Sequence, residues 1–220
     1  MVKEIIIEKS LKLKENEFAA KVRKILMRDQ GFMINIMGSP GSGKTTFIKN
    51  LVEKFGKKKA LVIQGDLESD IDKRTFDDLG VSCLQINTHS GCHLFPNTVY
   101  DQIKNFDLKN YDYLIVENVG NLVCPASIDL GQNLNILISS VPEGSDKAKK
   151  YQLIFHYSQI LVITKTDLIG PIDFDMKRFV SDAKRVNNKL KIFEVSNKAK
   201  LQYEDITSEI KRHKVGVINQ

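Results

Sequence analysis

Residues 32–50 read FMINIMGSPGSGKTTFIKN, and this segment sets the architecture expected for the whole chain. It begins with a run that is apolar except for one asparagine, which predicts a strand covered on both faces. A turn with three glycines follows, and from Lys44 onward apolar residues return at helical spacing. A strand, a turn ending in Gly-Lys-Thr and a helix form the context that a P-loop requires. A chance glycine-rich turn is the alternative, and the complete motif in this context disfavours it.

The predicted P-loop would bind the phosphates of a nucleotide. Its glycines allow successive backbone N–H groups and the helix N-terminus to face the phosphate oxygens. Lys44 would reach the β- and γ-phosphates and stabilise developing charge, and the Thr45 hydroxyl would bind Mg²⁺. The nucleotide-binding residues predicted here are Gly38, Ser39, Pro40, Gly41, Ser42, Gly43, Lys44, Thr45 and Thr46.

Strands and helices alternate along the rest of the chain. The β-rich segments read FMINIMG, KALVIQGD, VSCLQIN, YDYLIVEN, LNILISSV, QILVITKTD and LKIFEVS. Helical patterns lie at residues 17–29, 44–55, 72–79, 96–106, 146–156, 175–187 and 203–213. The alternation predicts right-handed βαβ units, and hence an α/β fold with a mostly parallel central sheet flanked by helices on both faces. Ligands of such sheets bind outside the carboxyl ends of the strands.

Length and composition indicate one domain in a reducing compartment. The 220 residues, of which 42% are hydrophobic and 27% charged, suffice for one α/β core. We expect a single P-loop domain over residues 1–220, with a strand and helix extension at residues 1–30 packed on it. Three cysteines, an odd number, do not form a disulfide framework, and they favour the cytoplasm.

Charge and hydropathy argue against two classes of partner. The net charge is +6, but the lysines are scattered, with only KFGKKK and DKAKK as modest clusters. A solvated lysine surface is therefore favoured over a nucleic-acid site. The N-terminal apolar run is too short and too interrupted for a signal peptide, and no run approaches the roughly 18 apolar residues of a membrane span. We expect a soluble protein that binds neither nucleic acid nor a membrane.

Acidic residues at strand ends are candidates for a magnesium site. Asp66 ends the second predicted strand and Glu117 the fourth, where a parallel sheet would bring their carboxylates to the P-loop. Asp72 is a further candidate, both for Mg²⁺ and for positioning the attacking water. The alternative for Asp72 is an acidic helix start, and the residues leave that choice open. The amide of Gly120 is expected to sense the γ-phosphate, so the predicted catalytic residues are Lys44, Asp72, Glu117 and Gly120.

The sixth predicted strand ends in T-K-T-D, which indicates the base that is bound. Lys165 and Asp167 have the spacing of the base-reading element of GTP-binding proteins, usually Asn-Lys-x-Asp. A carboxylate can accept two hydrogen bonds from the N1–H and N2–H₂ groups of guanine, which adenine does not offer. Thr164 stands in place of the usual asparagine, which alters one bracing contact. Ser196 and Asn197 follow the last strand, where a second base-contacting loop is expected.

Two loops carry residues that could bind a transition metal. Cys92 and His93 lie together in the sequence NTHSGCHLFPN, and Cys124 lies four residues after the glycine of ENVGNLVCP. Thiolate and imidazole ligands suit Zn²⁺ or Ni²⁺. Three ligands are too few for a closed tetrahedral site, so a site shared across a two-fold dimer is the economical hypothesis. Ordinary packing of these three residues is the alternative, which their spacing leaves open; Cys83, inside a predicted strand, is expected to be core.

These segments together resemble a known family. The segments GSPGSGKTT, GCHL, ENVGNLVCP, SVPEGSDKAKKY and TKTDL, with the following DFDMKRFVSDAKRVN, closely resemble the hydrogenase nickel-incorporation GTPase. The likeness covers nearly the whole chain, and ENVGNLVCP and GCHL are more specific than the P-loop. It implies a cytoplasmic nickel metallochaperone that hydrolyses GTP and dimerises on GTP, with Ni²⁺ or Zn²⁺ held at the subunit interface by Cys92, His93 and Cys124.

The resemblance also implies partners, and the chain departs from the family pattern at several points. The implied partners are a small zinc- and nickel-binding maturation protein and the large subunit of a nickel-iron hydrogenase.

The N-terminal cysteine cluster and the histidine-rich tract of some members are absent from this sequence. Phe95 and Asn97 occupy positions where relatives carry an acidic residue or a histidine. The related urease accessory GTPase has a Cys-Pro-His motif, whereas Cys92 and His93 are adjacent here.

The expected mechanism is a nucleotide switch. GTP would order the segments after Asp66 and Glu117, and because Cys124 follows Gly120 closely, a shift there would move a metal ligand. Without an evident catalytic glutamine or arginine finger, we expect slow hydrolysis. Three alternatives remain: a urease-type accessory GTPase, an ATP-dependent kinase or synthetase with structural cysteines, and a metal-binding module in which nucleotide is only structural.

Overall fold

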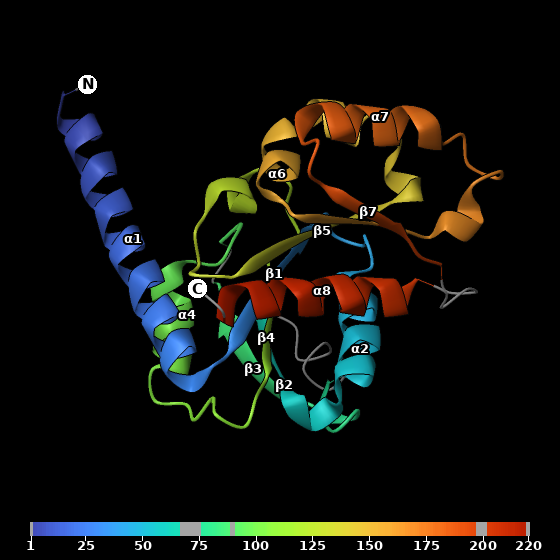
Figure 1. Cartoon of the computed structure of the whole chain (residues 1–220). Coiled ribbons are helices and arrows are strands. Elements are labelled where there is room, and N and C mark those ends of the chain that lie inside the picture. Colours follow the sequence, from blue (N-terminus) through green and yellow to red (C-terminus); the bar gives the residue numbers. More distant parts are fainter. Residues whose placement is uncertain (1, 67–75, 89–90, 197–201, 219–220) are drawn as a thin grey trace.

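A single seven-stranded parallel sheet forms the centre of the molecule (Figure 1). The computed structural model describes residues 2–66, 76–88, 91–196 and 202–218. The strand order is β3-β2-β4-β1-β5-β6-β7. The strands are β1 (Phe32–Gly38), β2 (Ala60–Asp66), β3 (Ser82–Asn87), β4 (Tyr113–Glu117), β5 (Leu134–Ser140), β6 (Ile160–Thr164) and β7 (Lys191–Glu194). The predicted α/β fold is thus confirmed, and in these residues every strand pair is parallel.

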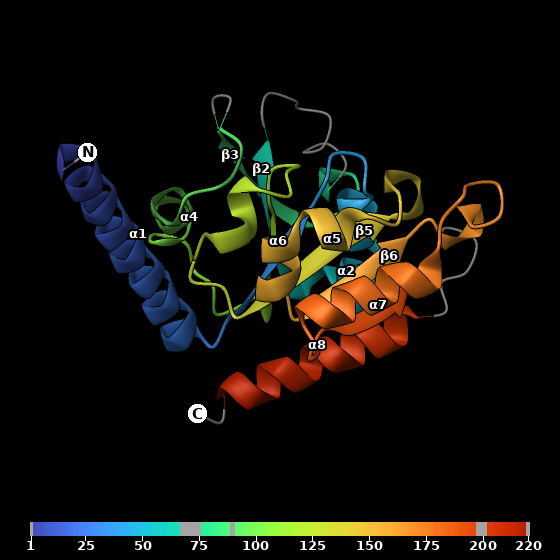
Figure 2. The same ribbon diagram turned by 90° about the horizontal axis from the view of Figure 1, so that it is seen from above.

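Helices cover both faces of the sheet, as predicted (Figure 2). The helices are α1 (Val2–Asp29), α2 (Lys44–Phe55), α4 (Pro96–Ile103), α5 (Lys147–Lys150), α6 (Gln152–Tyr157), α7 (Met176–Val186) and α8 (Tyr203–Ile218). Helices α2 and α8 share one apolar cluster with one face of the strands. On the other face, α1 and α4 cover the half of the sheet around β2 and β4, and α5, α6 and α7 cover the half around β5 and β6.

The P-loop strand lies near the middle of the sheet. All seven residues of β1 are buried, which explains the nearly unbroken apolar run FMINIMG. Strand β4 pairs on one side of β1 and β5 on the other, so that Ile36 lies opposite Glu117 and Gly38 opposite Ile138. The carboxyl ends of three neighbouring strands therefore meet at the point where β1 runs into α2.

The N-terminal extension differs from the prediction. A single helix, α1, replaces the strand and helix predicted for residues 1–30, because no glycine or proline interrupts the chain before Gly31. Its second half packs on the body, through Val22 and Leu26 and an ion pair of 2.6 Å between Arg23 and Asp129. Figure 2 shows the N-terminal half of α1 projecting away from the other elements.

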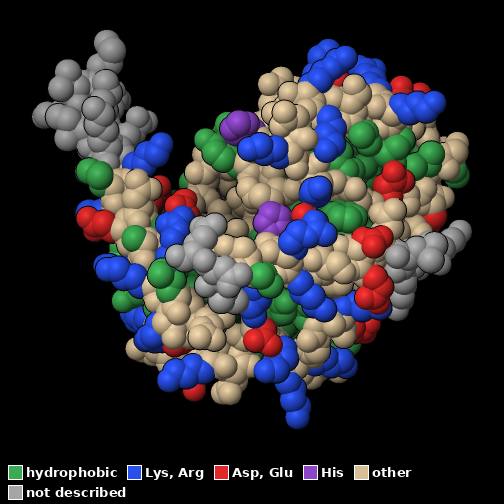
Figure 3. Space-filling view, viewed as in Figure 1, with side chains coloured by type: hydrophobic (Ala, Val, Ile, Leu, Met, Phe, Trp, Pro, Cys, Tyr) green, Lys and Arg blue, Asp and Glu red, His purple; other side chains and the backbone are tan. Residues whose placement is uncertain are grey.

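Other boundaries differ from the prediction in small ways. The helix predicted for residues 146–156 is divided into α5 and α6 by Tyr151, whose backbone leaves the helical region at φ −119° and ψ 51°. The helix predicted for residues 72–79 lies partly outside the described residues. Figure 3 shows Lys and Arg side chains spread among Asp and Glu over one face of the molecule. Among the described helices, none has a stretch apolar and long enough to cross a bilayer.

The docking of α1 can be tested at Gly131. The backbone of Gly131 has φ +85°, and a Cβ there would lie 2.7 Å from the carbonyl oxygen of Ala19 in α1. Gly80 also has a positive φ, +69°, but a Cβ there would meet no atom within 4 Å. We expect Gly80→Ala to lower the free energy of unfolding by about 1 kcal/mol through backbone strain alone. Gly131→Ala should cost at least about 1 kcal/mol more, since α1 must also move.

Urea unfolding measures both losses, and limited proteolysis reports the release of α1. Cleavage within α1 should be faster in Gly131→Ala than in Gly80→Ala. Equal losses of stability and equal cleavage rates would contradict the packing described here.

Candidate functional site

The glycine-rich turn after β1 has the backbone that its sequence predicts. Gly41 and Gly43 have φ angles of +71° and +97°, which favour glycine. At Gly38 a Cβ would lie 2.4 Å from the carbonyl oxygen of Ile138, so only glycine fits between β1 and β5. The next element, α2, begins at Lys44, whose ammonium donates hydrogen bonds to two carbonyls of the loop at 3.0 and 3.2 Å. The loop thus folds around the ammonium group of Lys44.

A cavity of about 260 Å³ lies beside this loop. Its lining residues are Pro40, Gly41, Lys44, Thr45, Gln64, Gly65, Glu117, Asn118, Val119 and Gly120. The hydroxyl of Thr45 donates a hydrogen bond of 2.6 Å to Glu117 Oε1. Two oxygens bound to one octahedral Mg²⁺ at about 2.1 Å lie roughly 3 Å apart. The spacing and the oxygen chemistry of this pair therefore fit a magnesium ion.

Gln64 is a site residue that the sequence analysis missed. It lies opposite Glu117 in the β2–β4 register, is 2% exposed, and its amide donates to Glu117 Oε2 at 3.1 Å. The thiol of Cys83 in turn contacts Gln64 Oε1 at 3.4 Å. A glutamine inside the apolar run ALVIQGD was the available signal, because a buried amide needs polar partners. Gln64 thus holds the carboxylate that faces Thr45.

The other predicted acidic residues are placed only in part. Asp66 is the last residue of β2 and directly follows Gly65, which lines the cavity. Asp72 lies outside the described residues, as does Asn197 of the second base loop. Their roles stay predictions.

A second cavity, of about 340 Å³, adjoins the other side of the α2 N-terminus. It is lined by Gly43, Thr46, Phe47, Asn50, Thr164, Lys165, Val195, Ser196 and Tyr203. The two predicted base loops therefore meet here, since Lys165 follows β6 and Ser196 follows β7. Asp167 lies two residues beyond Lys165 in the short 3₁₀ turn Thr166–Leu168, half-buried, and is not among the lining residues.

Hydrogen bonds connect the base loop directly to the P-loop. The Thr164 hydroxyl donates to the carbonyl of Ser42 at 2.6 Å, and the Lys165 ammonium donates to the carbonyl of Gly41 at 2.7 Å. Thr164, which stands in place of the usual asparagine, thus still connects the base loop to the P-loop by a hydrogen bond. Tyr203, also missed from the sequence, borders the cavity from the start of α8, and burial raises its pKa to about 12. Its hydroxyl accepts a hydrogen bond from the Asn50 amide at 3.3 Å.

The three predicted metal ligands come together. Cys92 and His93 lie in the loop between β3 and α4, and Cys124 begins the 3₁₀ turn η2 (Cys124–Ser127) after β4. Their ligand atoms all lie within 4.8 Å of one another, and the Cys92 sulfur is 3.3 Å from His93 Nδ1. Two sulfurs and one imidazole nitrogen make a donor set for a thiophilic divalent ion. The structure thus brings Cys124 together with two residues that are 31 and 32 positions before it in the sequence.

The electrostatics of this cluster favour a protonated Cys92 thiol and a neutral His93 imidazole. The pKa of the Cys92 thiol is raised by its hydrogen bond with Cys124, by burial and by the charge that a Cys124 thiolate would carry. Burial lowers the pKa of His93, and Glu15 on α1 partly opposes this effect. The His93 Nε2 atom is buried and has no hydrogen-bond partner among the described residues, while Nδ1 faces the sulfur. A neutral imidazole is the form that binds metals, and a bound cation would displace the thiol protons.

One connection between the two sites runs through Asn118. This side chain, 1% exposed, accepts a hydrogen bond from the backbone N–H of Leu94 at 3.1 Å and donates one to Asn35 in β1 at 3.1 Å. Leu94 directly follows His93 and packs on Gly65, where a Cβ would lie 2.7 Å from the leucine. The loop with Cys92 is therefore held against both β2 and the end of β4.

A second connection runs from the P-loop to Cys124. A Cβ on Gly120 would lie 2.8–3.0 Å from three atoms of Pro40, so the two segments touch. Gly38 forms an isolated antiparallel bridge with Asn121. The Asn121 side chain accepts hydrogen bonds from the backbone N–H groups of Val123 at 2.7 Å and Cys124 at 3.4 Å. Only a few residues therefore separate the P-loop contact from the Cys124 thiol.

The comparisons with known proteins agree with this geometry. Residues 32–194 match the family described as "CobW/HypB/UreG, nucleotide-binding domain". The "Hydrogenase/urease maturation factor HypB" of Helicobacter pylori (strain J99) is 38% identical over 204 residues, which cover 91% of this chain and 84% of the relative. The chain belongs to the HypB family. The resemblance found from the sequence is therefore confirmed.

Other HypB proteins extend the comparison. The "Hydrogenase maturation factor HypB" of Azotobacter vinelandii is 39% identical over 191 residues, or 86% of this chain. The match spans only 63% of that relative. The crystal structure of HypB from Helicobacter pylori in complex with nickel is 35% identical, with a TM-score of 0.87, and the match covers 93% of this chain and 97% of that one. HypB from Archaeoglobus fulgidus gives a TM-score of 0.85 at 32% identity, covering 94% of this chain and 99% of that chain.

The support of Glu117 by Gln64 can be tested by a double-mutant cycle. Gln64→Leu removes the amide donor to a buried carboxylate, and we expect the free energy of unfolding to fall by about 1–3 kcal/mol. Glu117→Leu removes the carboxylate itself. Because the two side chains share one hydrogen bond, the double variant should be more stable than the sum of the single losses predicts, by at least about 0.5 kcal/mol. Urea unfolding of the four proteins measures this, and strictly additive losses would contradict the contact.

Proposed function

We propose that this chain is a GTP-hydrolysing nickel metallochaperone for the maturation of nickel-iron hydrogenase. The segment from Glu117 to Cys124 carries the proposal, because it begins with a carboxylate at the P-loop and ends with a thiol in the metal-ligand cluster. The names of the HypB relatives and the nickel complex of one of them support it. GTP is then the substrate of the P-loop site, and nickel is the cargo of the cysteine cluster, with zinc as the competing ion.

The P-loop residues have distinct roles in the proposed hydrolysis. Lys44 and the loop amides would bind the β- and γ-phosphates and stabilise their developing charge. Thr45 and Glu117 would hold Mg²⁺, which when bound neutralises charge on the phosphate oxygens. Among the described residues that line the phosphate cavity there is no arginine, and Gln64 is engaged by Glu117. Slow intrinsic hydrolysis follows, with Asp72 proposed to position the attacking water.

The proposed switch uses the contacts between the P-loop and the segment after β4. A γ-phosphate at the loop would lie beside Gly120, whose backbone packs on Pro40. Reordering there would pass through Asn121 to the N–H of Cys124. Since the described part of one chain offers three ligands, two chains around a two-fold axis would offer six, and GTP would favour that dimer. Hydrolysis would then loosen the dimer and release the metal in the cytoplasm.

The proposed partners follow from the family. A small zinc- and nickel-binding maturation protein would exchange metal with this chain, and the hydrogenase large subunit would be the final recipient. The Helicobacter pylori relative is named for both hydrogenase and urease maturation, so a urease-type role is the second candidate. The adjacency of Cys92 and His93 favours the hydrogenase role. An ATP-dependent kinase or synthetase is the third candidate, and nucleotide preference separates it from the others.

Guanine recognition is tested at Asp167. Replacing the carboxylate by an amide in Asp167→Asn removes the acceptor for the guanine N1–H and N2–H₂ donors. We expect GTP affinity to fall about 100-fold, which corresponds to about 3 kcal/mol, while affinity for xanthosine triphosphate rises because the new amide can donate to its 2-oxo group. Asp173→Asn, at an exposed aspartate in the same loop, is the matched control. If the parent chain bound ATP more tightly than GTP, that result would contradict the proposal that it is a GTPase.

The coupling of nucleotide to metal is tested by titrating nickel with GDP and with a non-hydrolysable GTP analogue. In the double variant Cys92→Ala with Cys124→Ala, nickel affinity should fall more than about 100-fold, since even partners outside the ligand set contribute about 10- to 100-fold. Cys83→Ala is the control, because Cys83 lies in β3 outside the cluster. Light scattering on the same samples should report a dimer of the parent with the GTP analogue and a smaller mass with GDP.

Two outcomes would contradict the proposal in different ways. Equal nickel affinity for the parent and the double variant would mean that the cluster is not the metal site. Equal nickel affinity and equal mass with the two nucleotides would mean that the switch does not exist, even where metal and nucleotide both bind.

A further inference from the structure

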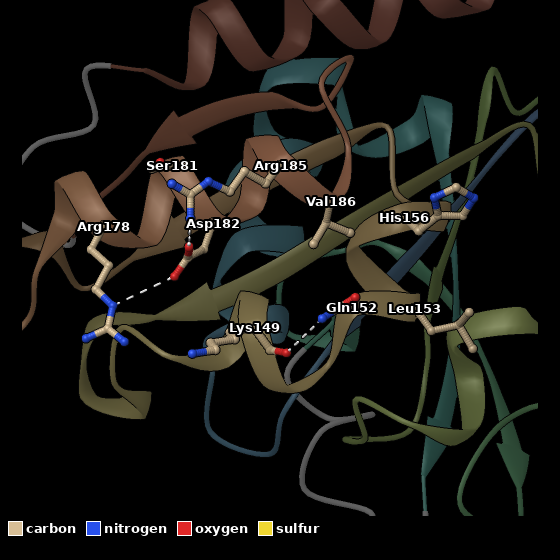
Figure 4. A pocket seen from close by; sticks show the side chains of 9 residues that line it. All are labelled: Lys149, Gln152, Leu153, His156, Arg178, Ser181, Asp182, Arg185 and Val186. Carbon is tan, nitrogen blue, oxygen red and sulfur yellow. Dashed lines mark hydrogen bonds and ion pairs between the residues drawn. The ribbon is translucent and has the colours of Figure 1, made fainter.

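A groove of about 740 Å³ lies beside α6 and α7 (Figure 4), on the opposite half of the molecule from α1 and α4 (Figure 1). It is lined by Lys149, Gln152, Leu153, His156, Arg178, Ser181, Asp182, Arg185 and Val186. One wall is the segment α5–α6, and the other is α7, as Figure 4 shows. None of these residues belongs to the nucleotide cavities or to the cysteine cluster. The groove is thus separate from the nucleotide and metal sites described above.

The groove is positively charged in spite of its one carboxylate. Asp182 lies between Arg178, at 3.8 Å, and Arg185, at 3.4 Å, and its own side chain is only 15% exposed. A single carboxylate does not neutralise two guanidinium groups and Lys149, so the walls keep a net charge of plus two. The arginine side chains remain 56% and 78% exposed. Their planar N–H groups are therefore accessible to carboxylates of another molecule.

The α6 wall adds an exposed apolar side chain, Leu153, to these charges, and Tyr157 on the same helix lies outside the lining of the groove. Leu153 and Tyr157 are 51% and 45% exposed, although both are large hydrophobic residues. They are four positions apart on α6 and so lie on the same side of that helix. Cations beside exposed apolar side chains match an amphipathic segment with acidic and apolar residues, whereas a free inorganic anion would use only the cations.

The position of α6 connects the groove with the metal-ligand cluster. Helix α6 packs against η2, the turn that begins with Cys124. Ile154 and Phe155 of α6 and Ala126 of η2 belong to the same buried cluster. The inward side of α6 therefore supports the cysteine turn, and its outward side borders the groove.

We propose that the groove between α6 and α7 binds an acidic amphipathic segment of a partner protein, and so holds that partner beside Cys124. The carboxylates of the segment would pair with Arg178 and Arg185, and its apolar residues would cover Leu153. Binding of the segment stands on the groove alone. Its use in metal exchange rests on the function proposed above.

The test uses a fluorescein-labelled helical peptide with glutamates on one side and leucines on the other, titrated with the full chain by fluorescence anisotropy. Arg178→Gln with Arg185→Gln is expected to weaken binding at least tenfold. Lys177→Gln with Lys189→Gln makes the same charge change at exposed lysines that do not line the groove, and should leave affinity within twofold. Peptides with glutamine for glutamate, or serine for leucine, should each bind at least tenfold more weakly than the parent peptide.

Several results would overturn the proposal. Equal weakening by the two double variants would mean that the peptide follows overall charge, and no weakening by the arginine variant would mean that it binds elsewhere. If the serine peptide bound as tightly as the parent peptide, the groove would be an anion site only. Nickel titration of the same variants tests the two proposals separately. If the parent chain did not bind nickel, the metallochaperone proposal would fail, but the measured affinity for the peptide would still decide whether the groove binds an acidic amphipathic segment.

Discussion

The close contact between the P-loop and the segment after β4 is the constraint on which the rest of the site depends. Parallel pairing of β1 with β4 brings the two chain segments out of the sheet side by side. Gly120 then packs on Pro40, and Gly38 bridges to Asn121, at distances that leave no space for a larger residue at Gly120. The P-loop and the cysteine-bearing loop are thereby in direct contact, with little space between their backbones.

Buried polar groups give this contact its specificity. Asn118 connects β1, the backbone of Leu94 and its own loop, and Gln64 connects β2 to Glu117. Each of these amides is nearly inaccessible to water, so a shifted strand register would leave it unpaired at a cost of about 1–3 kcal/mol. The interior is thus arranged so that the carboxylate near Thr45 and the turn that begins at Cys124 have few alternative positions. Helix α6, which borders the cationic groove, packs on the turn η2 that begins at Cys124.

Features that depend on residues close together in the sequence were predicted, and features that depend on residues far apart in the sequence were missed. The P-loop was recognisable because its strand, glycines and helix are consecutive, and the base loop because Lys165 and Asp167 are spaced within one turn. Gln64 and Tyr203 were missed because their significance depends on neighbours across the sheet. The N-terminal strand was predicted wrongly because a short apolar run fits both a strand and a helix, and only the lack of any break before Gly31 favours the helix.

The sequence by itself determined the parallel α/β fold, the phosphate loop and the family, because these depend on local periodicity and on motifs of consecutive residues. Only the tertiary structure decided that Cys92, His93 and Cys124 meet within 4.8 Å, that Glu117 faces Thr45, and that the arginines of α7 face α6. The physical reason is that strand order and register set which loops become neighbours. Those are properties of the packed sheet, to which residues distant along the chain contribute together.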